Sequence, residues 1–177
     1  MTILFPSMNS IFRLVRFFRS FSLFVFIIVL FYGYATLPGQ VAVGYDDYGT
    51  PNLYIDKSQL FYGLSIFVVV LNVAFMLLSN LLPSIPLSRL RLPNASFWAA
   101  HRNSLVRILL NWMHSFIGMT NVFVIACFIA VVWLNTTTYT QITNYGWLLI
   151  TGAIILLGWA AYLPLRLGRT VALHEDE

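Results

Sequence analysis

The sequence predicts an all-α membrane protein, a bundle of four transmembrane helices with a small folded loop on its outer side. Three observations support this fold class. The 177 residues are 59% hydrophobic and 9% charged, with a mean hydropathy of +0.81, which is too apolar for a water-soluble domain. Several apolar segments are long enough to cross a bilayer as helices. Nearly all basic residues fall on one side of these segments.

The expected spanning helices cover about residues 20–37, 60–83, 113–134 and 145–165. Pro83 and Pro86 are expected to end the second helix, and Pro164 with Arg166 the fourth. The helical pattern that leads into the third is nearly twice as long as a bilayer requires. We therefore divide it near Asn111 into an amphipathic interfacial section and a spanning helix.

The charged segments are expected to lie outside the hydrocarbon. Outer loops are predicted at 38–59 and 135–144, and an inner loop at 84–112. Within the first outer loop, alternation favours a short strand at 40–43, followed by a turn at 47–51. Before the first span, three arginines spaced three apart among apolar residues predict a helix along an anionic inner leaflet: Arg13, Arg16 and Arg19.

The distribution of basic residues predicts the orientation. On this map Lys57 lies on the outer side, and the other nine basic residues lie on the inner side: Arg13, Arg16, Arg19, Arg89, Arg91, Arg102, Arg107, Arg166 and Arg169. Cytoplasmic loops of membrane proteins are enriched in Lys and Arg. We therefore expect a multi-pass protein of the bacterial inner (cytoplasmic) membrane with both termini in the cytoplasm.

A line of polar and small residues follows one face of the expected third helix, with spacings of four, three, four and three: Arg107, Asn111, His114, Gly118 and Asn121. One interpretation is a polar seam that faces Asn72 of the second helix and lines a pocket open to the cytoplasm. The other is hydrogen bonding between helices, with Gly118 permitting close approach. No charged side chain is expected in the middle of a span, which weighs against an ion-coupled transporter.

The residue types favour no catalytic site, metal ion or cofactor. Neither His101 nor His114 has a carboxylate or cysteine at ligand spacing, and Cys127 is the single cysteine. The three loop aspartates, Asp46, Asp47 and Asp56, fit a solvated turn better than a calcium site. The basic residues form no Lys-rich or Arg-rich run, so we expect no nucleic-acid partner.

Two short motifs carry a resemblance to a known domain. The outer-loop motif comprises Pro38, Asp46, Asp47, Gly49, Pro51 and Lys57, and the inner-loop motif comprises Pro93, Asn94, Trp98 and Arg102. Both resemble an uncharacterised bacterial membrane domain that also forms the amino-terminal part of SdpI-type immunity proteins. In that domain a histidine precedes the loop's aromatic residue, and a serine precedes the lysine. In this sequence Gly44 and Asp56 stand at those positions.

Together these observations favour a non-enzymatic protein that acts through its partners. The leading hypothesis is an accessory subunit of a larger membrane complex or an SdpI-like immunity or sensor protein, which contacts membrane lipid and other membrane-protein subunits. The alternative is a small transporter or lipid-handling enzyme that uses the polar seam. A wet cavity along the seam would favour the alternative, and a dry helix contact would favour the leading hypothesis.

Overall fold

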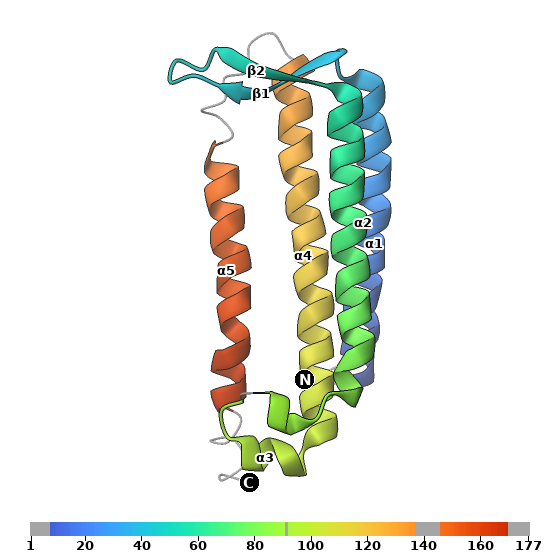
Figure 1. Ribbon diagram of the computed structural model, residues 1–177, viewed down its shortest axis with the longest axis vertical. Helices are drawn as coiled ribbons and strands as arrows, with labels where there is room; N and C mark the ends of the chain where they lie inside the picture. The colour runs from blue at the N-terminus through green and yellow to red at the C-terminus, as the bar shows by residue number, and fades with distance from the viewer. Residues whose placement is uncertain (1–7, 91, 137–145, 170–177) are drawn as a thin grey trace, which may run out of the picture.

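Four long helices run alternately up and down in a computed structural model that describes residues 8–90, 92–136 and 146–169 (Figure 1). They are α1 (Met8–Thr36), α2 (Lys57–Leu81), α4 (Arg102–Thr136) and α5 (Gly146–Arg169). Each contains a segment that is long and apolar enough to cross a membrane. The predicted four-helix fold class is thus confirmed at this level.

α4 stands in the middle of the bundle, with α1 and α2 on one side and α5 on the other (Figure 1). The contact between α1 and α4 is close at two levels. A Cβ atom on Gly118 of α4 would lie 2.6 Å from the Phe18 ring of α1, and one on Gly33 of α1 would lie 2.4 Å from the Phe128 ring of α4. Small residues at such positions allow helix backbones to approach each other in a membrane.

A β-hairpin covers one end of the bundle, which we call the hairpin end. It consists of β1 (Gln40–Tyr45) and β2 (Pro51–Asp56), paired antiparallel. The Asp46 side chain accepts hydrogen bonds from the backbone N–H groups of Tyr48 (3.0 Å) and Thr50 (2.7 Å), and Gly49 has a φ of 81°. The strand and turn expected from the sequence are confirmed, while β2 was not expected.

Short elements close the opposite end, which we call the α3 end (Figure 1). Two 3₁₀ helices, η1 (Leu82–Ser84) and η2 (Leu87–Arg89), precede α3 (Ala95–Ala100). They surround a hydrophobic cluster of buried side chains from α3, α4 and α5: Trp98, Leu105, Leu109 and Leu167. This cluster fixes the connection between α2 and α4.

Three helices extend beyond the expected spanning segments, and the expectation that Pro164 ends the last helix was wrong. α1 begins at Met8 and not near residue 20, and α4 is continuous through Asn111. Between Met8 and residue 20, and between Arg102 and residue 117, the sequence contains no Gly or Pro to break a helix. α5 continues past Pro164 to Arg169, because Leu167 packs in the α3-end cluster and holds the last turns in place.

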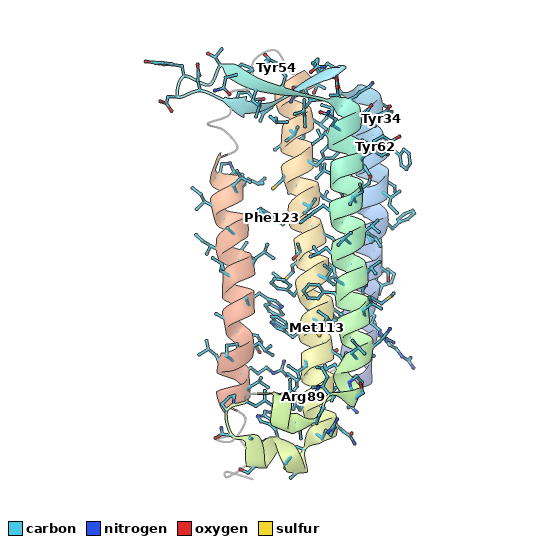
Figure 2. All side chains as sticks on the ribbon, viewed as in Figure 1. Tyr34, Tyr54, Tyr62, Arg89, Met113 and Phe123 are labelled. Carbon is cyan, nitrogen blue, oxygen red and sulfur yellow. The ribbon has the colours of Figure 1, made fainter. Side chains whose placement is uncertain are left out.

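Tyrosines gather near the hairpin end of the bundle (Figure 2). Tyr34 of α1 and Tyr62 of α2 lie there with exposed rings, and Tyr54 lies on the hairpin. The Lys57 ammonium lies 5.0 Å from the centre of the Tyr34 ring. Amphipathic rings at one level suit the boundary between lipid and water.

Candidate functional site

A buried polar network joins three helices in the interior of the bundle. The Asn72 amide of α2 donates to the side-chain oxygen of Asn121 of α4 at 2.9 Å, and the Asn121 amide donates to the Ser22 hydroxyl of α1 at 3.1 Å. All three residues are buried. The predicted facing of Asn72 and Asn121 is observed, and this part of the seam is a dry helix contact.

Arg19 extends this network and contradicts one expectation. Its guanidinium donates to the backbone oxygen of Asn72 at 3.0 Å and lies 3.2 Å from Nδ1 of His114. The expectation that Arg19 precedes the first span is wrong, because Arg19 lies within the candidate spanning segment Phe12–Thr36. A guanidinium is only a donor, so His114 accepts at Nδ1 and carries its proton on Nε2.

The remaining seam residues lie in different surroundings. Gly118 packs on Phe18 of α1. Asn111 lies beside α5, where its side-chain oxygen is buried without a partner among the described residues. Arg107 lines a second cavity next to Arg102. These residues have different neighbours for a geometric reason. At about 100° per residue, the five seam positions cover an arc of about 80° around the axis of α4, and different helices contact the two edges of that arc.

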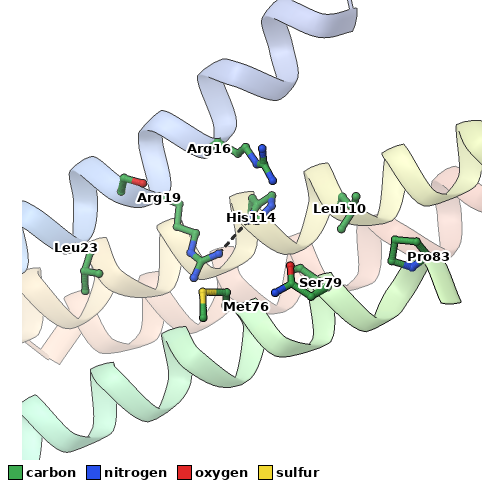
Figure 3. Close-up of a pocket in the computed structure, with 10 residues that line it drawn as sticks. Arg16, Arg19, Leu23, Met76, Ser79, Pro83, Leu110 and His114 are labelled. Carbon is green, nitrogen blue, oxygen red and sulfur yellow. Dashed lines mark hydrogen bonds between the residues drawn. The ribbon is translucent and has the colours of Figure 1, made fainter. Parts of the chain in front are cut away.

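A cavity of about 620 Å³ opens beside His114, between α1, α2 and α4 (Figure 3). Its lining combines two arginines with polar and apolar side chains: Arg16, Arg19, Ser20, Leu23, Met76, Ser79, Asn80, Pro83, Leu110 and His114. Arg16 and Asn80 are exposed, whereas His114 is buried at the inner wall. The seam is therefore dry at Asn121 and bordered by a cavity at His114.

The charges of the described residues are separated along the bundle. The described acidic residues, Asp46, Asp47 and Asp56, all lie in the hairpin segment, and the other three acids of the chain, at 175–177, lie outside the described residues. Arginines dominate the opposite half, as Arg89 in Figure 2 illustrates. No described carboxylate therefore accompanies Arg16 and Arg19.

One side chain hydrogen-bonds the hairpin to the end of α4. Asn135 accepts a hydrogen bond from the backbone N–H of Ala42 at 2.8 Å and donates to the backbone oxygen of Ala42 at 3.1 Å. It thereby pairs with β1 as a neighbouring strand residue would. Val41 and Ala42 are buried on the helices, while β2 is mostly exposed.

The outer-loop motif residues form the ends and turn of this hairpin. Asp46 and Gly49 shape the turn, and Pro51 begins β2. Asp47 is exposed, and among the described residues no hydrogen bond joins its side chain to the helices. Exposed Pro38 precedes β1, and Asp56 at the end of β2 accepts a hydrogen bond from the Gln40 amide. The motif is therefore structural in its turn and at its base.

Gly44 and Tyr45 mark where the hairpin is irregular. The strand register shifts around Gly44, and a Cβ atom there would lie 2.7 Å from the Cβ atom of Leu53. A larger side chain would therefore not fit at this position. Burial raises the pKa of Tyr45 above its ordinary value, and neighbouring Tyr54 adds to the increase.

The inner-loop motif organises the α3 end. Asn94 adopts a left-handed conformation (φ 58°) before α3, where it follows exposed Pro93. Trp98 is 1% exposed in the α3-end cluster. Arg102 donates to the backbone oxygens of Pro83 (2.8 Å) and Ile85 (3.0 Å), so it supports the segment after α2.

No protein-family model matches the chain, and no curated protein or solved structure is significantly similar to it.

Proposed function

We propose that this chain is a non-enzymatic protein of the bacterial inner membrane whose hairpin recognises a partner protein on the outer side. Accessory subunits and SdpI-like immunity or sensor proteins are the roles that this proposal covers. The observation that carries it is the attachment of an exposed hairpin to the bundle through Asn135. A recognition surface held in one conformation binds with a smaller loss of entropy than a mobile loop does.

The surface chemistry of the hairpin supports recognition of a protein. Tyr48 is 95% exposed, Leu53 56% and Tyr54 52%. Asp46 and Asp47 lie beside Tyr48, so aromatic and acidic groups stand together. Tyrosine is enriched in protein interfaces because it combines a large apolar ring with a hydroxyl group.

Site-specific photocrosslinking in native membranes tests the proposal. A photoreactive amino acid at Tyr48 or Tyr54 is expected to give one discrete protein adduct, whereas the same group at exposed Tyr62 of α2 serves as the matched control and is expected to give none. Asp46→Ala should weaken the adduct at Tyr48, because it removes both hydrogen bonds that shape the turn. No adduct at either hairpin position, or equal adducts at all three, would refute the proposal.

The cavity beside His114 favours a second candidate function, a small transporter or lipid-handling enzyme that uses the polar seam. Substitutions discriminate the two candidates. If His114→Ala and Asn121→Ala abolish function while changes at Asp46 and Asp47 do not, the second candidate is supported. The opposite pattern supports recognition by the hairpin.

A further inference from the structure

We propose that the cavity between α1, α2 and α4 binds the phosphate of an anionic phospholipid from the leaflet at the α3 end. Arg16 and Arg19 are the groups that would hold this phosphate. The site is separate from the hairpin, so this inference goes beyond the proposed partner recognition and can fail independently of it.

The first argument is the uncompensated charge in the cavity. An arginine within a spanning segment is costly to place in lipid, and such residues usually pair with another group. Arg19 lies in an α1 segment apolar enough to span, and its described partners, His114 and the Asn72 carbonyl, are both neutral. An anionic ligand would supply the missing negative charge.

The second argument is the supply of hydrogen-bond donors. A guanidinium has five N–H groups, and the two described bonds of Arg19 leave three for a ligand. Arg16 lies one helical turn earlier, with its guanidinium 4.5 Å from the centre of the Phe12 ring. Exposed Ser20 of α1 and Asn80 of α2 add a hydroxyl and an amide to the same lining. Phosphate oxygens favour this combination of planar guanidinium and neutral donors.

The third argument identifies the phosphate as part of a lipid. α1 and α2 spread apart around the cavity toward the end where α1 begins (Figure 3), and Leu23, Met76 and Leu110 give part of the lining an apolar character. The volume of about 620 Å³ suits a headgroup, since small-ligand sites commonly measure about 300–1,000 Å³. Acyl chains would then leave the cavity past Met76, a lining residue that is also exposed on the bundle surface.

Native mass spectrometry of the full chain in mild detergent tests the inference. Phosphatidylglycerol and phosphatidylcholine both contain a phosphate, but only the first has a net negative charge. We expect one phosphatidylglycerol molecule to be retained in preference to phosphatidylcholine, and Arg16→Gln to weaken its retention about fivefold, the effect of one basic residue near an anionic headgroup. Arg16 is exposed and makes no hydrogen bond among the described residues, so this change should leave the fold intact.

Arg13→Gln is the matched control. Arg13 is exposed on the same helix but does not line the cavity, so its replacement should leave lipid retention unchanged. Equal weakening by both substitutions, or equal retention of both lipids by the unaltered chain, would overturn the inference. Displacement of phosphatidylglycerol by inorganic phosphate at the same concentration would also overturn it, by assigning the site to a soluble anion. Hairpin crosslinking should be the same in Arg16→Gln as in the unaltered chain, which separates the two proposals.

Discussion

Asn121 is the residue on which the buried network depends, because it bonds to both Asn72 and Ser22 while being 1% exposed. We expect Asn121→Leu to lower the free energy of unfolding by about 1–2 kcal/mol, since it leaves the Asn72 amide with fewer partners in an apolar interior. Unfolding in mixed micelles titrated with dodecyl sulfate measures this change.

The double variant Asn72→Leu/Asn121→Leu is the informative companion. It removes both amides together, so the loss should be smaller than the sum of the two single losses. Additive losses would mean that the 2.9 Å bond between these side chains contributes nothing beyond packing.

Gly118 allows a second prediction at the residue scale. A Cβ atom there would lie 2.6 Å from the Phe18 ring, so Gly118→Ala should force α1 and α4 apart and destabilise the bundle by about 1–3 kcal/mol. Gly158 of α5 is the matched control, because a Cβ atom on it would meet nothing within 4 Å. Gly158→Ala should be neutral or stabilising, owing to the better helix propensity of alanine. A loss of the same size at both glycines would contradict the close contact.

Residue spacing predicted the meeting of Asn72 and Asn121 but not the role of Arg19. Arg19 was assigned to an interfacial segment because it precedes the first uncharged run. Its spacing with Ser22, Phe26 and Leu30 could have assigned Arg19 to the inner face of α1. These four residues lie on one face of a helix, and the structure shows Ser22, Phe26 and Leu30 buried. Hydropathy alone does not show that face, because it averages over all faces of a helix.

At the scale of elements, Asn135 connects the hairpin to α4. Asn135→Ala removes both hydrogen bonds to Ala42. We expect faster hydrogen exchange at the Ala42 amide, by about tenfold if the bond contributes roughly 1.4 kcal/mol, with unchanged exchange in the helix interiors. Thr136→Val is the control, because the Thr136 hydroxyl donates to Val132 of its own helix. Unchanged exchange at Ala42 in Asn135→Ala would show that hairpin packing alone holds β1.

Element types were more predictable than element ends. Four apolar segments are long enough to identify all four helices, and Asp46 with Gly49 identifies the turn. β2 was missed because it is mostly exposed and its pairing is irregular near Gly44, so it lacks the alternating pattern of a half-buried strand. The helical pattern of α4 was recognised over its length, but a bilayer-length rule divided it near Asn111, because that rule does not account for the cluster around Trp98 that buries its first turns.

At the scale of the whole molecule, the opposite placement of acidic and basic residues predicts how the protein inserts. The described arginines of the loops and helix ends lie toward the α3 end, whereas Asp46, Asp47 and Asp56 lie at the hairpin end. The positive-inside rule then places the α3 end in the cytoplasm and the hairpin outside. This orientation is required by both proposals, because one needs an accessible outer hairpin and the other an anionic inner leaflet.

Reporter fusions in a bacterial host measure this orientation. Green fluorescent protein fused after Glu177 should fluoresce, and alkaline phosphatase inserted in the turn next to Tyr48 should be active, because the first folds in the cytoplasm and the second requires export. The exchanged pair is the control and should give little signal at either position.

An even number of spans also requires that reporters at both chain ends agree. If they disagree, one of the four long helices does not cross the membrane, and α5 becomes the first helix to test, because it stands apart from α1 and α2 on the far side of α4 (Figure 1).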